Sequence, residues 1–206
     1  DFSKSLYGNR NHSFKDICRF ITHGETFSFD VGKFNDSYFN YVAGFGVFPS
    51  VSYTTPQDMK NRLGYVAYVL NFLTTIPGGL TYKKHCKITH DGIVDEGDFM
   101  LGLITNSISV AGTQPGVIKK SSLNDGVFEA LLIRANPSPI DVAEMIAAFN
   151  GNCDHCNGVL TFQFKNATFE FEDAVPWTLD GEDGGHVQNS EISVIPERIT
   201  VFVPKK

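Results

Sequence analysis

The stretch LTYKKHCKITHDGIVDEGDFMLGLIT, residues 80–105, decides the fold of this chain. Its two parts, 80–89 and 93–105, are rich in residues that favour extended backbone. Between them stands Asp91-Gly92, a dipeptide typical of a two-residue hairpin turn. The stretch therefore predicts two antiparallel strands joined by a tight turn.

Strands of the same kind are expected on both sides of this hairpin. They cover 26–31, 38–47, 127–134, 159–164, 168–172, 191–195 and 198–203. Residues 32–37 and Lys165-Asn166-Ala167 predict two further hairpin connections. Helical spacing and capping signals predict helices over 13–22, 55–76 and 137–149. This order predicts a mostly β protein, an antiparallel β-sandwich with two to three inserted helices.

Composition excludes several classes of function. The chain has 206 residues and a net charge of -6, so it lacks the basic footprint of a nucleic-acid binder. No apolar run reaches the roughly 18 residues that a membrane span needs. The spacing of Cys18, Cys86, Cys153 and Cys156 does not suggest a disulfide framework, and free thiols are expected. Cys153-Asp154-His155-Cys156 resembles half of a zinc site, but no second ligand pair stands at a typical spacing.

The segment Pro176–Glu182 carries two nearby carboxylates. If it is extended, Asp180 and Glu182 project on one face with Gly181 between them. Two close carboxylates can hold a divalent cation or provide a general base. Asp-Gly is also a strong turn signal, so the spacing alone leaves a plain hairpin turn open.

Three other segments have chemical interest. Gly44 and Gly46 end a predicted strand, where packing or a bulge is the expected role. Residues 106–112 form a polar loop that could line a cleft. Asn124-Asp125-Gly126 predicts a tight turn; its carbonyls could bind Mg²⁺ or Ca²⁺, although a plain turn is the more common meaning.

Taken in order, short segments of the chain resemble the C-terminal domain of soluble bacterial diacylglycerol kinases, relatives of the sphingosine and ceramide kinases. The matching segments span nearly the whole chain: Asp1–Leu6, Phe29–Gly32, Phe39–Gly46, Lys60–Tyr68, Ile104–Gly112, Asn124–Gly126 and Leu179–Glu182. The GGDGT nucleotide loop of the family is absent from the chain. Gly112-Thr113 replaces a common Gly-Gly pair, and Phe48-Pro49-Ser50 replaces a common Asp-Ala.

The resemblance implies a domain organisation and a site. Residues 1–24 would begin the domain that follows a missing ATP-binding domain, and 25–206 would form the lipid-binding and catalytic sandwich, its last strand packing with the missing domain. Asp180 and Glu182 would work at the cleft between the domains. Glu182 is preferred as the general base and Asp180 as its hydrogen-bonding and metal-network partner, with the reverse assignment open.

The resemblance also implies a structural Mg²⁺ held by the main-chain carbonyls at Ser122, Asp125 and Val127. The implied reaction is phosphorylation of diacylglycerol to phosphatidic acid in bacterial phospholipid biosynthesis, with ATP as co-substrate. The chain would be inactive without the N-terminal ATP-binding domain. We expect a cytoplasmic protein attached peripherally to the inner face of the membrane, with a homodimer left open.

Two alternatives stay open on the sequence. One is a non-enzymatic lipid-binding or interaction β-sandwich, whose many Phe residues would line a slot for an acyl chain. The other is a kinase for a sphingoid base or another lipid alcohol. The apolar segment 76–80 could dip into a membrane interface or pack in the core.

Overall fold

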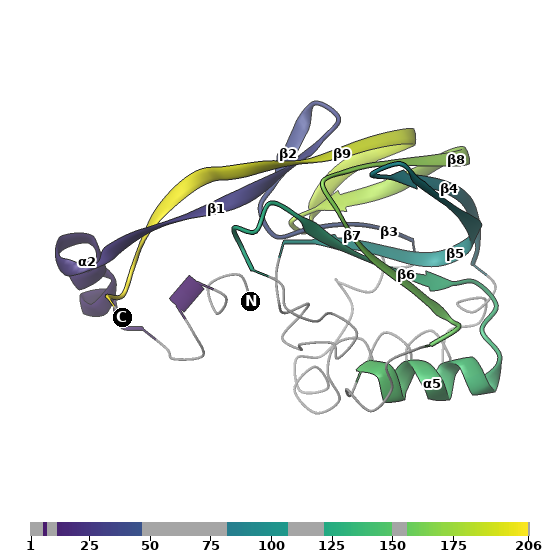
Figure 1. Ribbon diagram of the computed structural model, residues 1–206, viewed down its shortest axis with the longest axis horizontal. Helices are drawn as coiled ribbons and strands as arrows, with labels where there is room; N and C mark the ends of the chain where they lie inside the picture. Colours follow the sequence, from purple (N-terminus) through teal and green to yellow (C-terminus); the bar gives the residue numbers. More distant parts are fainter. Residues whose placement is uncertain (1–5, 8–11, 47–81, 107–121, 150–155, 206) are drawn as a thin grey trace.

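The computed structural model describes residues 6–7, 12–46, 82–106, 122–149 and 156–205, drawn as ribbons in Figure 1. The helix predicted over 55–76, its apolar end at 76–80, most of the polar loop 106–112 and Cys153 lie outside the described residues.

The described residues form nine strands and two regular helices. The strands are β1 Glu25–Phe34, β2 Ser37–Phe39, β3 Val42–Gly46, β4 Lys84–His90, β5 Ile93–Thr105, β6 Phe128–Arg134, β7 Val159–Phe164, β8 Asn166–Leu179 and β9 Glu182–Val203, and the helices are α2 Phe14–His23 and α5 Pro139–Phe149. The prediction of a mostly β protein with inserted helices is confirmed.

All strands belong to one antiparallel sheet that closes on itself. Its order is β2-β1-β9-β8-β3-β5-β6-β7, and β4 pairs with both β5 and β8. β5 pairs with β4 over 93–99 and with β3 over 101–105. β8 likewise pairs with β4 near its start and with β3 near its end. Strands β3, β5, β4 and β8 therefore form a closed ring, and the two layers of the expected sandwich are continuous.

One predicted hairpin is confirmed and another is wrong. Asp91 and Gly92 both have positive φ, 45° and 89°, and they join β4 to β5. The strands on either side of Lys165, β7 and β8, do not pair with each other. β7 pairs with β6, whereas β8 pairs with β4 and β9, so this connection is not a hairpin. The Asp91 carboxylate instead accepts hydrogen bonds from the amides of Lys165 (2.9 Å) and Asn166 (3.0 Å). This contact holds the β7–β8 connection against the β4–β5 turn.

Aromatic side chains fill the centre of the closed sheet. Trp177 is 1% exposed and packs against the rings of Phe34 and Phe45, each with a centroid separation of 4.9 Å. Phe169 and Phe171 complete this group. Burying rings of this size is a principal source of stability in a sandwich. The described Phe side chains of this group therefore form a filled core.

The glycines of β3 allow close packing, as predicted. Gly46 has φ 106°, and a Cβ there would meet the main-chain carbonyl of Met100 on β5. A Cβ at Gly44 would press on Leu103 and on the carbonyl of Gly102. β3 can thus lie tightly between β5 and β8 because it has no side chain at these two positions.

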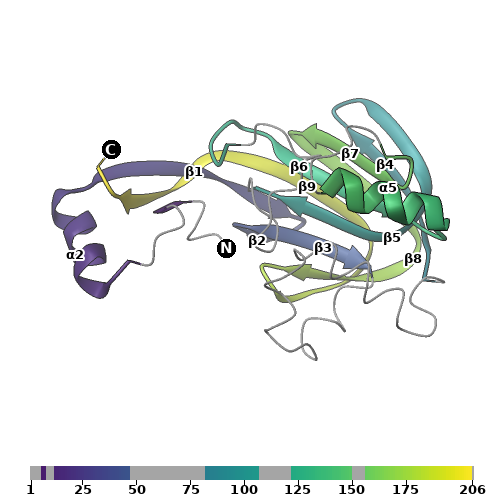
Figure 2. The same ribbon diagram turned by 90° about the horizontal axis from the view of Figure 1, so that it is seen from below.

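A two-stranded ribbon leads away from the body to α2 (Figures 1 and 2). It consists of residues 25–29 of β1 paired with 199–203 of β9. The Ser13 hydroxyl accepts from the Asp16 amide, and the Asp16 carboxylate accepts from the Ser13 amide. This capping box starts α2, and Gly24 ends it. None of the side chains of α2 is fully buried.

Candidate functional site

Asp180 and Gly181 form the turn between β8 and β9. Their φ angles are 53° and 95°, and they connect Leu179 with its cross-strand partner Glu182. Of the two conformations left open by the sequence, an extended segment and a hairpin turn, the structure has the turn, because the chain reverses direction at Asp180. The carboxylates of Asp180 and Glu182 are therefore brought to the same end of the sheet by a hairpin, and both residues are exposed.

The Asp180 carboxylate caps the start of β3. It accepts hydrogen bonds from the main-chain amides of Asn40 (2.7 Å), Tyr41 (2.8 Å) and Val42 (2.9 Å). The Asp180 amide in turn donates to the Val42 carbonyl at 2.7 Å. A carboxylate has about four acceptor positions, and three of those of Asp180 receive main-chain donors. Asp180 thus fixes the turn to the link between β2 and β3.

Glu182 differs from Asp180 in its surroundings. Within the described part of the chain, its carboxylate receives no hydrogen bond and forms no ion pair. It follows the turn directly and begins β9. Its lone pairs are therefore available to accept a proton, whereas those of Asp180 are largely occupied.

The loop Ser122–Val127 is closed by its own aspartate. Asp125 accepts hydrogen bonds from the amides of Ser122 (3.0 Å) and Val127 (3.3 Å). The main-chain carbonyls of Ser122, Asp125 and Val127 receive no hydrogen bond from other described residues. These oxygens are hard donors of the kind that Mg²⁺ prefers, so their chemistry fits the implied ion. The described residues contain no cluster of three or more His, Cys, Asp or Glu side chains suited to a metal.

Asp30 anchors this loop from β1. Its side chain is buried and accepts from the amides of Gly126 and Glu197, both at 2.7 Å. Its own amide donates to the Leu123 carbonyl at 2.8 Å. Sequence reasoning gave Asp30 no role of its own. The available signal was a single acidic residue inside a predicted apolar strand.

Asn106 connects the turn at Asp180 with the loop at Ser122–Val127. Its main-chain amide donates to the Tyr41 carbonyl at 3.1 Å, next to the amide held by Asp180. Its side-chain nitrogen donates to the carbonyls of Asp30 (2.8 Å) and Leu123 (3.4 Å). A continuous chain of hydrogen bonds thus joins the two segments that the sequence singled out. Asn106 Oδ1 is buried and has no hydrogen-bond partner among the described residues.

Among the described cysteines and histidines, Cys86, Cys156, His85 and His90 take no part in the hydrogen bonds that join Asp180 to the Ser122–Val127 loop. Cys86 is buried on β4, and burial raises the pKa of its thiol to about 12. Cys156 is half-buried and lies just before β7. His85 and His90 of β4 pair with carboxylates of β5.

Comparison with known proteins places the chain beside bacterial diacylglycerol kinases. No family model matches. A curated protein named diacylglycerol kinase from Bacillus subtilis (strain 168) is 28% identical over 208 residues, covering 100% of this chain and 66% of the relative. One of the same name from Staphylococcus carnosus (strain TM300) is 26% identical over 203 residues, covering 97% and 65%. The predicted resemblance is confirmed, and the match is to the C-terminal part of these relatives.

The fold is shared with a solved structure. A crystal structure described as a diacylglycerol kinase from Bacillus anthracis str. Sterne superimposes with a TM-score of 0.69 at 20% identity, covering 100% of this chain and 65% of that one. At this identity the likeness concerns the fold alone. The chain spans just under two thirds of the length of the curated relatives named above. Neither described helix has the length and apolar character needed to cross a bilayer.

Proposed function

We propose that this chain is the C-terminal domain of an ATP-dependent lipid kinase that transfers the γ-phosphoryl group of ATP to the hydroxyl of diacylglycerol. The observation that carries the proposal is the hydrogen-bonded chain from Asp180 through Asn106 to the Ser122–Val127 loop. It joins a carboxylate pair to a loop with three carbonyl oxygens that accept no hydrogen bond from the described residues. The names of the relatives supply the substrate class.

Glu182 is the proposed general base. Phosphoryl transfer needs a positioned nucleophile and a group that accepts its proton. Glu182 is exposed at the β8–β9 turn and has no hydrogen-bond donor among the described residues, so it can accept the proton of the lipid hydroxyl. Asp180 is the positioning residue. Its three main-chain hydrogen bonds hold the turn, and therefore Glu182, at a fixed place relative to β3.

Mg²⁺ is the proposed metal of the Ser122–Val127 loop. The carbonyls of Ser122, Asp125 and Val127 would hold it, and its charge would keep these three oxygens together. This role is structural, because it would stabilise the loop that Asp30 and Asn106 already anchor.

The ATP site is proposed to lie in a domain that precedes this one. About a third of the length of each relative lies outside the match to this chain, and the GGDGT loop is not among the 206 residues. The exposed apolar side chains of α2, Phe14 (85%) and Ile21 (55%), and Phe202 (46%) at the end of β9 would pack with that domain. We propose peripheral attachment to the cytoplasmic face of the membrane, where the lipid is present.

The test is a kinase assay on the full-length protein. Radiolabelled ATP is supplied with diacylglycerol, a sphingoid base or a monoacylglycerol in mixed micelles. We expect phosphorylation of diacylglycerol, and a loss of about two to four decades in turnover for Glu182→Gln. Glu172→Gln, an exposed glutamate on β8 at a distance from the turn, is the matched control and is expected to retain turnover.

Each result has a distinct meaning. Near-normal turnover of Glu182→Gln would remove the base assignment. Phosphorylation of the sphingoid base with none of diacylglycerol would show that the proposed substrate is wrong. The proposed reaction, phosphoryl transfer to a lipid alcohol, would still hold. Failure to phosphorylate any lipid, with saturable lipid binding retained, would favour a non-enzymatic lipid-binding domain.

A further inference from the structure

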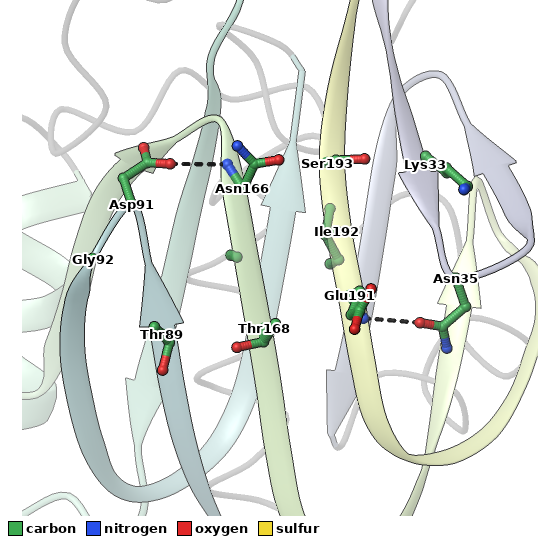
Figure 3. A pocket seen from close by; sticks show the side chains of 11 residues that line it. Lys33, Asn35, Thr89, Asp91, Gly92, Asn166, Thr168, Glu191, Ile192 and Ser193 are labelled. Atoms are coloured by element: carbon green, nitrogen blue, oxygen red, sulfur yellow. Dashed lines mark hydrogen bonds between the residues drawn. The ribbon is translucent and has the colours of Figure 1, made fainter.

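A pocket lies on the sheet at the opposite end of β8 from Asp180. The pocket has a volume of about 470 Å³, within the usual range of small-molecule sites. Figure 3 shows the side chains that surround it. Its polar lining residues are Lys33, Asn35, Thr89, Asp91, Asn166, Thr168, Glu191 and Ser193. β8 runs from Asn166 at this pocket to Leu179 beside Asp180, roughly 45 Å of strand.

The strand register places these side chains in two rows on one face of the sheet. Thr89 of β4 is opposite Thr168 of β8, which is opposite Glu191 of β9. In the next row, Ser193 of β9 is opposite both Asn166 of β8 and Lys33 of β1.

The residues between these rows point to the other face. They are His90, Ala167, Ile192 and Phe34, opposite one another on the same four strands, and all are buried. Because side chains alternate along a strand, the two polar rows must face away from the core.

Two of the lining residues serve the scaffold. The Asp91 carboxylate accepts from the amides of Lys165 and Asn166, and Asn35 Oδ1 accepts from the Glu191 amide at 2.8 Å. Figure 3 draws the Asp91–Asn166 and Asn35–Glu191 hydrogen bonds as dashed lines. They fix the walls without closing the space between them.

The remaining polar groups are available to a ligand. Five lining side chains form no hydrogen bond or ion pair with any described residue: Lys33, Glu191 and the hydroxyls of Thr89, Thr168 and Ser193. The set combines one cation, one free carboxylate and three hydroxyls. Each hydroxyl both donates and accepts.

We propose that this pocket binds a polyhydroxylated molecule, either a free sugar or polyol or the glycosyl headgroup of a lipid. Hydroxyls of such a ligand can donate to Glu191 and accept from Lys33 while exchanging hydrogen bonds with the Thr and Ser side chains. A simple anion is disfavoured, because the carboxylates of Glu191 and Asp91 lie in the same lining as Lys33. This proposal is independent of the kinase function, since none of the groups at Asp180, Asn106 or the Ser122–Val127 loop takes part.

The experiment is a binding titration of the full-length protein by NMR and calorimetry. The free probes are maltose and myo-inositol; the lipid probe is a phosphatidylcholine vesicle that carries diglucosyl diacylglycerol, with plain phosphatidylcholine vesicles as its reference. We expect saturable binding with shifts at the amides of Thr168, Glu191 and Ser193. Free probes that bind identify a soluble ligand, and binding to the glycolipid vesicle alone identifies a headgroup; either result supports the proposal.

Variants assign the binding to the pocket. Thr168→Val with Glu191→Gln should weaken it about tenfold or more, because two of the ligand's hydrogen-bonding partners are lost. Thr161→Val with Glu172→Gln, exposed positions outside the pocket, is the matched control and should retain full affinity. If the first pair of changes lowers the unfolding temperature, Ser193→Ala replaces it, with a weakening of about threefold expected.

Three results would overturn the proposal. They are the absence of saturable binding to every polyol probe and to the glycolipid vesicle, binding that persists unchanged in the pocket variants, and preferential binding of inorganic phosphate that depends on Lys33. Kinase turnover is not part of these measurements, so failure here leaves the proposed lipid kinase untouched and failure of the kinase leaves the pocket untouched.

Discussion

The main-chain amide of Gly126 donates a 2.7 Å hydrogen bond to Oδ2 of Asp30, a residue 96 positions earlier in the chain. Asp30 is buried, and its other carboxylate oxygen accepts from Glu197 of β9. One side chain therefore connects β1, β9 and the loop proposed to hold Mg²⁺. A buried carboxylate of this kind is strongly destabilised when its donors are removed.

Asp30→Asn is expected to loosen that loop. The amide retains one acceptor oxygen but turns an NH₂ group toward one of the two main-chain donors. We expect a loss of about 2–3 kcal/mol in the free energy of unfolding. Hydrogen exchange should also become faster at the amides of Gly126 and Glu197. Asp36→Asn, in the exposed β1–β2 turn, should change neither quantity appreciably; equal effects of the two variants would contradict the anchoring role.

Variants of Asp180 and Glu182 should differ in their free energy of unfolding, although both are expected to lose activity. Asp180→Ala removes the acceptor of three main-chain amides and should lower the free energy of unfolding by about 1–2 kcal/mol, since the site is exposed. Glu182→Gln should stay within about 0.5 kcal/mol of the parent. Urea denaturation of the full-length proteins measures both. A larger loss for Glu182→Gln than for Asp180→Ala would show that the two roles are reversed.

Two glycines with positive φ form a matched pair of tests. Gly46→Ala adds a Cβ against the Met100 carbonyl in a left-handed conformation, so we expect a cost of about 3 kcal/mol or more. At Gly181 the conformation is similar, φ 95°, but no atom of the described residues lies within 4 Å of an added Cβ, and Gly181→Ala should cost about 1 kcal/mol. Similar unfolding free energies for the two variants would argue against tight packing of β3 on β5.

His85 should titrate above the ordinary histidine range. Its Nδ1 lies 3.0 Å from Asp98 and its Nε2 3.0 Å from Glu96, so both ring nitrogens must carry protons to satisfy both contacts. Hydrogen bonds first to Asp98 and then to Glu96 raise the pKa of His85 above 6.5. The protonated form is favoured in the folded state. The resulting stabilisation is complete below pH 6.5 and is lost as the pH rises through the raised folded pKa.

NMR titration of the His85 ring tests this. Asp98→Asn should lower the pKa of His85 more than Glu96→Gln does, because Asp98 is the larger cause. Glu172→Gln serves as the reference and should have no effect. A titration midpoint of His85 that is unchanged in Asp98→Asn would contradict the pairing.

Much of the sheet could be predicted from local patterns. The turn at Asp91-Gly92 and the strands around it follow from dipeptide chemistry and from alternation. The closure of β3, β5, β4 and β8 could not be predicted, because β5 and β8 each change partner along their length, from β4 to β3, and only tertiary pairing decides that change. The Lys165-Asn166-Ala167 connection also has the local pattern of a hairpin turn, but a distant contact decides its conformation. Its amides are satisfied by Asp91, a residue more than 70 positions away, and no local pattern encodes that contact.

The candidate site was predicted in its residue types but not in its geometry. The carboxylates of Asp180 and Glu182 were identified from spacing and resemblance. The actual conformation is a turn, because Val42 and its neighbours supply main-chain donors that draw Asp180 out of the strand. Asn106 and Asp30 were quoted only as parts of motifs. Their connecting role depends on hydrogen bonds between segments 76 residues apart, which a single sequence does not reveal.

The pairing of β1 with β9 has a consequence for how the protein is made. Glu25 lies opposite Val203, so the first long strand finds its partner in the last residues of the described chain. During synthesis β1 leaves the ribosome many residues before that partner exists. The edge of β1 that pairs with β9 is therefore unpaired during this time. Contacts of such long sequence separation slow folding and expose nascent chains to association. Completion of the sheet therefore has to await the synthesis of β9, and chaperone protection of the nascent β1 edge would matter most in that interval.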